Sequence, residues 1–375
     1  MQKLSALLLF LFAWTGLAAA PVPAPPQLNA SGYLLIDVDS GRVLAEHNAD
    51  QRLEPASLTK IMTAHVVFSE LRSGHLKMDE PVRVSKKAWQ MPGSRMFIEV
   101  GNQVPVSALL NGLIIQSGND SSVALAEHIA GSEETFASMM NQHAKELGMN
   151  GTHFVNATGL PDPDHYTTPR DIAKVSEATI RDFPEYYPLY AEKEFRYNDI
   201  RQPNRNLLLW RDPSVDGIKT GHTEAAGYCL VASAKRDGQR LISVVMGTNS
   251  ENARAADSQA LLNYGFRFFE THRLYGAGQS LTKVRVWKSA PETVDAGLAK
   301  DMYVTIPRHE YDRLQARTEI NPKLMAPLAK GDVVGKLVVE LDGTPLAESP
   351  IIVMQDAPAG GIWRRAVDAA KLWLE

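Results

Sequence analysis

Ser57 and Lys60 carry side chains whose types and spacing suit acyl transfer to a hydroxyl. They are three residues apart at the start of a predicted helix, so both side chains lie on one face. A helix N-terminus favours negative charge nearby, which helps the hydroxyl to lose its proton. Lys60 can accept that proton where burial or another cation lowers its pKa. Ser57 is therefore the candidate nucleophile and Lys60 the candidate base, although chance Ser-x-x-Lys pairs occur on solvated helices.

Two later stretches carry side chains that suit the same chemistry. Ser117-Gly118-Asn119 follows an apolar run in a glycine-broken turn and offers a second hydroxyl for proton relay and an amide to hold a substrate. The alternative is an ordinary turn, which these three residue types also favour. Lys219-Thr220-Gly221 lies in a strand-like run, where a lysine and a threonine can bind a carboxylate and a glycine lets a ligand backbone approach. Here the alternative is an exposed strand edge with a solvated lysine.

The segments around these stretches predict an α+β fold. Residues 33–38 and 43–46 are β-rich runs on either side of a turn and predict an antiparallel hairpin. Apolar residues spaced by three and four predict a helix over residues 55–69. Further segments predict helices over 106–130, 132–147, from 168 onward and 252–269, and paired strands over 227–234 and 241–246. Because helices and strands are segregated along the chain, we expect a helical cluster beside an antiparallel sheet.

The length and composition of the chain indicate a globular protein of two domains. The 375 residues are 44% hydrophobic and 22% charged, and short alternating runs replace helical patterns after about residue 280. We expect a catalytic domain over residues 21–279 and a small all-β domain over residues 280–357. The net charge of −4 leaves no domain-wide basic excess to neutralise phosphates, so we expect no nucleic-acid partner.

Both ends of the chain indicate export and a membrane surface. Residues 1–20 have a basic start, a short apolar core and closing alanines, which predicts a cleaved signal peptide. Residues 358–375 predict an amphipathic helix that lies on a membrane over Ile362 to Glu375; the alternative is a helix packed on the β domain. Its apolar face comprises Ile362, Ala366, Ala369, Ala370 and Trp373, and its opposite face comprises Arg364, Asp368, Lys371 and Glu375.

The cysteine and histidine content argues against disulfides and metals. Cys229 is the single cysteine, and its apolar surroundings predict an inert buried thiol. The histidines show no metal-ligand spacing and no His-Glu-x-x-His motif occurs. We therefore expect no metal and no cofactor.

The three motifs occur together in the order typical of serine β-lactamases and penicillin-binding proteins. The chain further resembles the low-molecular-mass penicillin-binding proteins that are D-alanyl-D-alanine carboxypeptidases, over nearly its whole length. The stretches that carry this resemblance are Pro55-Ala56-Ser57-Leu58-Thr59-Lys60, Gln116-Ser117-Gly118-Asn119-Asp120, Arg201-Gln202-Pro203-Asn204-Arg205-Asn206 and Lys219-Thr220-Gly221-His222-Thr223. The resemblance implies the β-lactamase-like catalytic fold of that family.

The resemblance also implies a reaction. The substrate is a peptidoglycan stem peptide ending in D-Ala-D-Ala, β-lactams are covalent inhibitors, and the protein lies peripherally on the periplasmic face of the bacterial inner membrane. Ser57 attacks the last peptide carbonyl, D-alanine leaves, and water hydrolyses the acyl-enzyme. The remaining implied roles are Lys60 as base, Ser117 as proton relay, Asn119 in substrate positioning, Lys219 and Thr220 on the terminal carboxylate with Arg254 as a further partner, Gly221 beside them in substrate binding, and the backbone N–H groups of Ser57 and His222 as the oxyanion hole.

Two other classes of protein can carry the same three motifs. A β-lactamase needs a positioned acid and a water for rapid deacylation, yet Asp162, Asp164 and Asp171 do not follow the class A pattern. Nor does a β-lactamase need a second domain and an amphipathic tail. A catalytically idle peptidoglycan-binding protein is the second alternative, against which the three intact motifs argue. Endopeptidase action on peptide crosslinks stays open.

Overall fold

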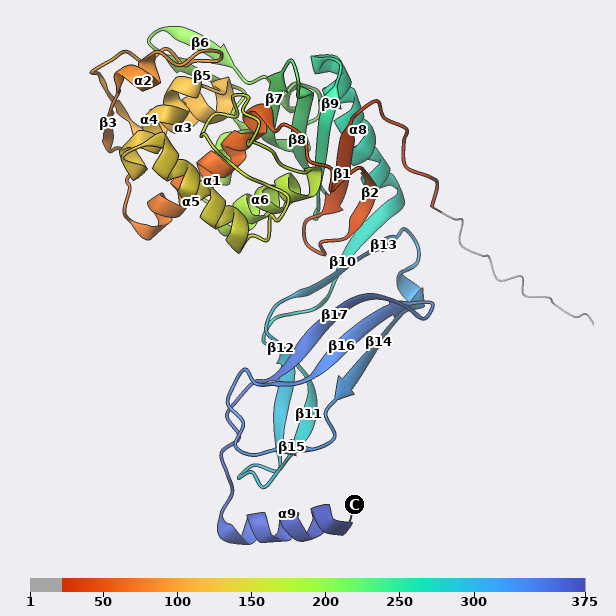
Figure 1. The fold of residues 1–375 in the computed structure, drawn as a ribbon. Helices are drawn as coiled ribbons and strands as arrows, with labels where there is room; N and C mark the ends of the chain where they lie inside the picture. Colours follow the sequence, from red (N-terminus) through yellow and green to blue (C-terminus); the bar gives the residue numbers. More distant parts are fainter. Residues whose placement is uncertain (1–21, 375) are drawn as a thin grey trace, which may run out of the picture.

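The computed structural model describes residues 22–374 of the chain. A broad region of sheet and helices carries an elongated β domain below it, and a single helix closes the chain at the far end of that domain (Figure 1). The predicted signal peptide, residues 1–20, lies outside the described residues, as does Glu375 at the end of the predicted tail helix. The predicted α+β fold with a small all-β domain is confirmed.

A five-stranded antiparallel sheet forms the centre of the upper region. Its strands run in the order β2 (Val43–His47), β1 (Gly32–Asp37), β9 (Gln239–Thr248), β8 (Gly227–Arg236) and β7 (Val215–Thr223). The predicted early hairpin is the β1–β2 pair. Leu34 and Ile36 face one core and Tyr33 and Leu35 the other, as the two-residue period of a strand requires. Both faces of the sheet are therefore buried.

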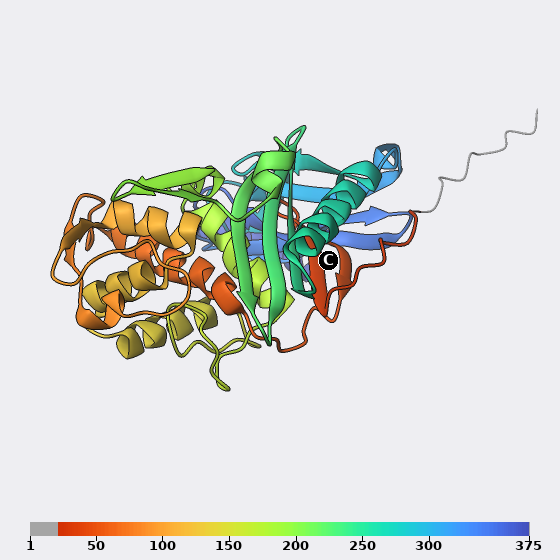
Figure 2. The same cartoon turned by 90° about the horizontal axis from the view of Figure 1, so that it is seen from above.

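Helices cover both faces of this sheet. Figure 2 shows α8 (Glu251–Phe268) on one side and the helical cluster on the other. The cluster comprises α1 (Thr59–Ser73), α2 (Lys86–Trp89), α3 (Val106–Asn111), α4 (Asn119–Ala130), α5 (Glu133–Glu146) and α6 (Pro169–Asp182), whereas the short α7 (Leu208–Arg211) packs in the same core as α8. Ser132 and Thr168 cap α5 and α6 by accepting the backbone N–H three residues on, so the two predicted helix starts are confirmed. The short pairs β3 (Pro81–Arg83) with β4 (Gln103–Pro105) and β5 (Glu194–Tyr197) with β6 (Ile200–Pro203) border the cluster.

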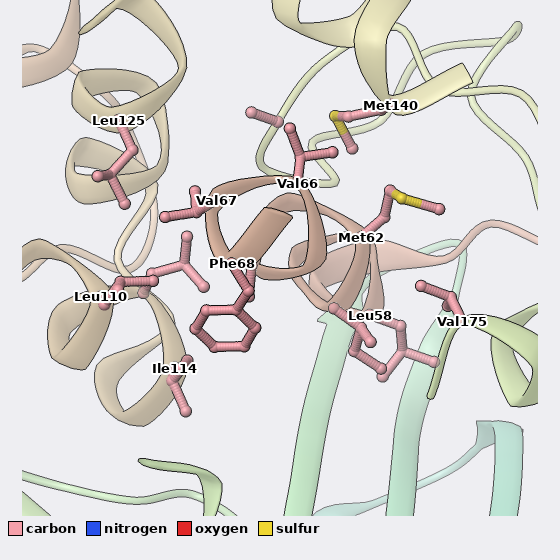
Figure 3. Close-up of a cluster of buried hydrophobic side chains, with 14 of the residues drawn as sticks. Leu58, Met62, Val66, Val67, Phe68, Leu110, Ile114, Leu125, Met140 and Val175 are labelled. Atoms are coloured by element: carbon pink, nitrogen blue, oxygen red, sulfur yellow. The ribbon is translucent and has the colours of Figure 1, made fainter. Parts of the chain in front are cut away.

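Helix α1 runs through the middle of the cluster. Every residue from Thr59 to Phe68 is buried, so the helix has no solvent face in this stretch. Figure 3 shows its side chains packed against the surrounding helices, with Leu58, Met62, Val66, Val67 and Phe68 meeting Leu110, Ile114, Leu125, Met140 and Val175. A helix that is buried on all sides belongs to the core, and this position holds its first turn rigidly in place.

The β domain is built on a six-stranded sheet. Its strands follow the order β14 (Leu314–Ile320), β16 (Val333–Leu341), β17 (Thr344–Val353), β12 (Thr293–Leu298), β11 (Ser280–Trp287) and β15 (Leu324–Met325). A separate pair, β10 (Phe269–Tyr275) and β13 (Met302–Pro307), lies between this sheet and the catalytic region (Figure 1). Strand β10 follows α8 without an intervening residue.

A buried carboxylate joins the two regions. Asp37, at the end of β1, has no exposed surface and accepts hydrogen bonds from the Ser40 amide at 2.9 Å and the Thr271 hydroxyl at 2.5 Å. The Gln239 side-chain amide donates to it at 3.2 Å, and the Ser40 hydroxyl lies 2.5 Å from that of Thr305 on β13. Because buried hydrogen bonds to a charged group are strong, this Asp37 joint fixes the two regions relative to each other.

Helix α9 (Ile362–Leu374) is docked on the far end of the β domain through its polar face. The fully buried Asp368 accepts the Lys288 backbone N–H at 2.7 Å, and guanidinium nitrogens of Arg285 and Arg364 lie 3.8 and 3.5 Å from its carboxylate. Its apolar side chains point to solvent; those more than three-quarters exposed are Ile362, Trp363, Trp373 and Leu374. Among residues 22–374, no helix is both long and apolar enough to cross a membrane.

Candidate active site

Ser57 lies in a short 3-10 turn, Ala56–Leu58, that leads directly into α1. Its hydroxyl is 3.0 Å from Nζ of Lys60, one turn further along, so the predicted pairing of these side chains is confirmed. The preceding residue, Ala56, has a φ of +47°, a left-handed conformation that costs an alanine ~1–2 kcal/mol. Strain of this kind is typical of functional sites, where the surrounding structure holds a residue in an unusual geometry.

Lys60 is a buried amine with three oxygen neighbours. Besides Ser57, its Nζ contacts the side-chain carbonyl of Asn119 at 2.7 Å and the backbone carbonyl of Thr158 at 2.6 Å. Burial, and then the cation of Arg205, lower the pKa of Lys60 to about 7. A neutral amine has two N–H bonds and one lone pair. The two carbonyls accept both N–H bonds, which leaves the lone pair for the Ser57 hydroxyl proton.

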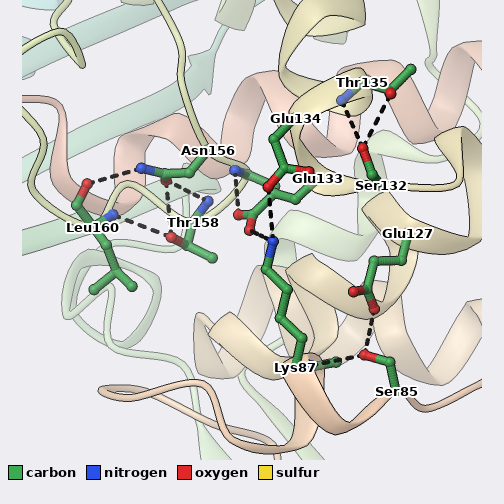
Figure 4. A network of polar contacts seen from close by, with 12 residues as sticks. Ser85, Lys87, Glu127, Ser132, Glu133, Glu134, Thr135, Asn156, Thr158 and Leu160 are labelled. Carbon is green, nitrogen blue, oxygen red and sulfur yellow. Dashed lines mark hydrogen bonds and ion pairs between the residues drawn. The ribbon is translucent and has the colours of Figure 1, made fainter.

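A compact loop places the Thr158 carbonyl on Lys60. The Asn156 side-chain oxygen accepts the backbone N–H groups of Thr158 and Gly159 at 3.1 and 2.8 Å, and its amide donates to Leu160 at 3.0 Å. Figure 4 shows this network beside Glu133, which accepts the Ala157 N–H. No role for this loop was predicted from the sequence, although its Asn, Thr and Gly residues are typical of turns closed by a side chain.

Gly159 lies directly against the nucleophile's turn. Its φ is +82°, and a Cβ at this position would come within 1.7 Å of the Ala56 carbonyl oxygen. Only glycine fits this contact, because both the conformation and the space exclude a side chain. The loop over residues 156–160 and the turn that carries Ser57 are therefore packed backbone to backbone.

The Ser117-Gly118-Asn119 turn follows a π-helical turn, Gly112–Gln116, of the kind often found at functional sites. Ser117 has a φ of +64° and lines the same cleft as Ser57, but within residues 22–374 no hydrogen bond joins its hydroxyl to Ser57 or Lys60. Asn119 contacts Lys60 through its oxygen and donates to the Pro92 carbonyl at 2.7 Å. Its amide thus already positions the base and a neighbouring loop.

Strand β7 brings Lys219-Thr220-Gly221 to the cleft. Lys219 is only 2% exposed, so the alternative of a solvated lysine at a strand edge is wrong. Burial, followed by the cations of Lys60, Arg205 and Arg254, lowers the pKa of Lys219 well below its usual value. Its Nζ lies 3.1 Å from the Thr220 carbonyl oxygen, and Thr220 and Gly221 line the cleft.

His222 and Arg254 complete the wall of the cleft. The His222 ring stacks on that of Tyr228 with a centroid separation of 4.0 Å. Arg254 is 3% exposed and donates to the Gly221 carbonyl at 3.1 Å and to Glu251 at 3.3 Å. Arg254 therefore supports the backbone of β7 as well as bordering the cleft.

The cleft has a volume of about 320 Å³ and gathers the residues that the sequence predicted. Ser57, Ser117, Asn119, Thr220, Gly221, His222 and Arg254 line it, while Lys60 and Lys219 are buried beneath its surface. Lining residues without a predicted role are Gly93, Ser94, Thr158, Gly159, Leu160, Arg205, Thr223, Tyr228 and Glu251. Arg205 lies in one of the stretches that carry the family resemblance, so its presence in the cleft could have been predicted from that resemblance.

The groups in this cleft suit nucleophilic attack on a substrate that carries a carboxylate. A hydroxyl lies against an amine that is partly neutral near pH 7, and further basic side chains surround the cleft. Over residues 22–374, no group of three or more His, Cys, Asp or Glu side chains is placed to hold a metal ion. Cys229 is fully buried, and burial raises the pKa of its thiol to about 11, as expected for an inert cysteine.

Sequence comparisons match both regions of the chain to known families. A family model described as D-alanyl-D-alanine carboxypeptidase matches residues 19–250, and one described as the C-terminal domain of penicillin-binding protein 5 matches residues 269–359. D-alanyl-D-alanine carboxypeptidase DacA of Escherichia coli (strain K12) is 44% identical over 94% of this chain and 89% of its own length. The carboxypeptidase DacC of the same strain is 45% identical, over 96% of this chain and 92% of its own.

Solved structures agree with these matches. Penicillin-binding protein 5 from Haemophilus influenzae superimposes with a TM-score of 0.87 and 43% identity, over 90% of this chain and 99% of that one. Penicillin-binding protein D2 from Listeria monocytogenes, in an ampicillin-bound form, gives a TM-score of 0.59 and 30% identity, over 64% of this chain and 98% of that one. The likeness to the first structure includes the β domain, and that to the second covers a smaller share of this chain.

Proposed function

The chain belongs to the D-alanyl-D-alanine carboxypeptidase family of penicillin-binding serine enzymes, and we propose that Ser57 is the nucleophile with which it removes the terminal D-alanine of peptidoglycan stem peptides. The observation that carries the proposal is the contact of 3.0 Å between the Ser57 hydroxyl and the buried Nζ of Lys60. The alternatives of a β-lactamase and of an idle binding protein are not favoured by the comparisons.

Acylation begins at Ser57. Its oxygen attacks the carbonyl carbon of the penultimate D-alanine while its proton passes to the lone pair of neutral Lys60. We assign the backbone N–H groups of Ser57 and His222 to the oxyanion, a contribution of roughly 3–4 kcal/mol per donor in other enzymes. The C–N bond then breaks, and the leaving amine takes the proton from Lys60 by way of Ser117. Water afterwards hydrolyses the ester and returns Ser57 to its free form.

The other predicted residues hold the substrate. We assign Lys219 and Thr220, with Gly221 and Arg254 beside them, to the terminal carboxylate, because two basic side chains and a hydroxyl lie at one side of the cleft. Asn119 positions the substrate indirectly, since its amide holds Lys60 and the loop at Pro92.

Release of D-alanine tests the proposed activity directly. The full-length protein incubated with a pentapeptide ending in D-Ala-D-Ala should liberate free D-alanine, measured by an amino-acid oxidase assay. Absence of release would contradict the activity. A penicillin should acylate Ser57, as the ampicillin-bound Listeria protein suggests, and the adduct should last for hours. In a β-lactamase the adduct would instead be hydrolysed within milliseconds.

The rate of acylation should depend on pH through Lys60. Because the pKa of this amine is lowered to about 7, it is neutral above that pH and able to accept the Ser57 proton. As the pH falls below about 7, Lys60 becomes charged and the rate constant should drop by up to ~10-fold per pH unit. Stopped-flow acylation with a reporter β-lactam measures this. If the rate constant of acylation stays unchanged down to the pH at which carboxylates titrate, Lys60 is not the base.

We further propose that the protein is exported and bound peripherally to the periplasmic face of the inner membrane through Ile362 to Glu375. Support comes from the exposed apolar face of α9, which lies opposite the docked Asp368. The β domain then acts as a spacer. We keep residues 21–279 as the catalytic domain and 280–357 as the β domain, although the family model for the latter begins at residue 269.

The two tryptophans of α9 provide a test of this attachment. Trp363 and Trp373 are 86% and 85% exposed, so each can bury most of its side chain in the lipid interface. Trp363→Ser and Trp373→Ser should each weaken vesicle binding by about 10-fold, measured by flotation. Trp210→Ser is the matched control, since Trp210 is 48% exposed on the catalytic region. Equal losses in control and test variants would contradict the role of α9.

A further inference from the structure

His165 is a buried histidine that has no role in the reaction described above. It follows the loop over residues 156–160 along the chain and precedes α6. Only 2% of its surface is exposed, and its ring packs edge to face against that of Phe154 with a centroid separation of 5.7 Å. A polar ring in such a position has to find partners for both of its nitrogens within the protein.

The partners of the two ring nitrogens fix where the proton of His165 lies. The backbone N–H of Val155 donates to Nδ1 at 3.1 Å, so Nδ1 is an acceptor. The neutral ring therefore carries its proton on Nε2, which lies 2.8 Å from the Thr59 hydroxyl oxygen and donates to it. One tautomer of the ring thus satisfies both contacts.

The ring of His165 is neutral under the conditions in which the base titrates. Burial is the main reason that the pKa of His165 is lowered to about 4. Of the charged groups that face the ring, Asp162 opposes this shift, whereas His153 and Lys60 add to it. The pKa of Lys60 is lowered only to about 7, so the two contacts of the ring stay unchanged while Lys60 gains or loses its proton.

The contacts of His165 join the loop over residues 156–160 to the start of α1. Thr59 is fully buried and lies between the nucleophile and the base in sequence. Val155 directly precedes the loop, and the backbone N–H of His165 donates to the Asp162 carbonyl at 2.9 Å after the loop has ended. One ring therefore ties the entry and the exit of the loop to the turn that carries the reacting groups.

A second contact fastens the same loop to α1 one helical turn further on. The Thr63 hydroxyl donates to the Ala157 carbonyl at 2.8 Å. Two anchors on one helix prevent the loop from pivoting about either of them. The Thr158 carbonyl, which Figure 4 shows within the network of the loop, is thereby kept at 2.6 Å from Nζ of Lys60.

We propose that His165 is a positioning residue for acylation, whose bond to Thr59 keeps the Thr158 carbonyl on the catalytic base. Without this bond the loop is held to α1 by its second anchor alone, and the carbonyl can move away from the amine. The amine then loses one of the two acceptors that orient its N–H bonds, so its lone pair is no longer directed at the Ser57 hydroxyl. This inference rests on the proposed acylation of Ser57.

The test measures acylation of the full-length protein by a reporter β-lactam, well above the pH at which Lys60 titrates. For His165→Leu we expect the rate constant at saturation to fall about 10- to 100-fold, while the half-saturating concentration changes less than about 3-fold, because the groups that hold the substrate are untouched. His165→Gln should stay within about 3-fold of the wild type, since its amide also offers an acceptor and a donor. Equal losses in the two variants would show that His165 only fills space and would overturn the proposal.

His65→Leu is the matched control for the loss of a buried histidine. His65 lies on α1, is 4% exposed, and its Nδ1 is 3.1 Å from the Thr179 hydroxyl on α6. Burial lowers the pKa of His65 to about 4 as well. The variant should lose melting temperature to a similar extent as His165→Leu but keep its acylation rate constant within about 3-fold of the wild type. The same slowing in both variants would overturn the role of His165.

Thr59→Val removes the same hydrogen bond from its other partner and serves as the test if His165→Leu does not fold. It should slow acylation about 10-fold by itself, and adding it to His165→Leu should slow that variant by less than about 2-fold, because both changes delete one link. A wild-type rate in Thr59→Val, or fully additive losses, would contradict the link. A wild-type protein that forms no adduct would instead contradict the proposed function itself, so the two failures are distinguishable.

Discussion

Ser57→Ala should abolish the covalent adduct with penicillin and lower D-alanine release by at least ~10³-fold. Removal of a serine nucleophile in other enzymes costs even more, because no neighbouring group replaces its oxygen. Here Lys60 is fully buried and its other two neighbours are carbonyl oxygens, so among residues 22–374 no second hydroxyl is hydrogen-bonded to the base. Intact-protein mass spectrometry measures the adduct, and the oxidase assay measures D-alanine.

The control for this variant is Ser138→Ala, which removes an exposed hydroxyl on α5 that, in the described part of the chain, bonds only to the Glu134 carbonyl of its own helix. Ser138→Ala should keep the adduct and full turnover. Circular dichroism of Ser57→Ala should match the wild type, since the change deletes one oxygen. An adduct of unchanged mass and stoichiometry on Ser57→Ala would show that another residue is the nucleophile.

Gly159→Ala should impair acylation almost as severely without touching any reacting group. The added Cβ would lie 1.7 Å from the Ala56 carbonyl oxygen, so the turn that carries Ser57 or the loop that carries Thr158 must move. A displacement of about 1 Å at a reacting group costs ~10²-fold in rate. We expect acylation by a reporter β-lactam to slow by at least that factor, with a lowered melting temperature.

Gly131→Ala separates this clash from the general effect of a left-handed glycine. Gly131 has a φ of +78°, close to the +82° of Gly159, but a Cβ there meets no atom within 4 Å. It should lose ~1 kcal/mol of stability and retain normal acylation. Similar acylation rates in the two variants would mean that the contact between Gly159 and Ala56 does not position the nucleophile.

The parts of the site that follow from local spacing were predictable from sequence. Ser57 and Lys60 are three residues apart at the start of a helix, so the local spacing already brings their side chains to one face. The strand character of residues 219–221 and the buried state of Cys229 likewise follow from the apolar runs around them. The three motifs occur in the order typical of serine β-lactamases and penicillin-binding proteins, and this order indicated that they form one site.

The parts that depend on distant contacts were not predictable in this way. Asn119 and Thr158 reach Lys60 across 59 and 98 residues of sequence, and no periodicity encodes such a meeting. The burial of Lys219 arises because β7 packs against the turn at Ser57, where a Cβ on Gly221 would approach Pro55 within 3.1 Å. Helix α1 is buried on all sides only because other helices and the sheet surround it.

The Asp37 joint has a consequence for how the enzyme meets an insoluble polymer. Because α8 passes into β10 without a linker and Asp37 is tied to Thr271, the cleft cannot swing freely about its support. On the proposed attachment of α9 to a lipid surface, the stem peptides within reach would form a thin layer parallel to that surface. Turnover then scales with the number of enzyme molecules per unit area rather than per unit volume. Stem peptides far above or below that layer would not be cleaved, because the stiff joint fixes the distance between the cleft and the surface.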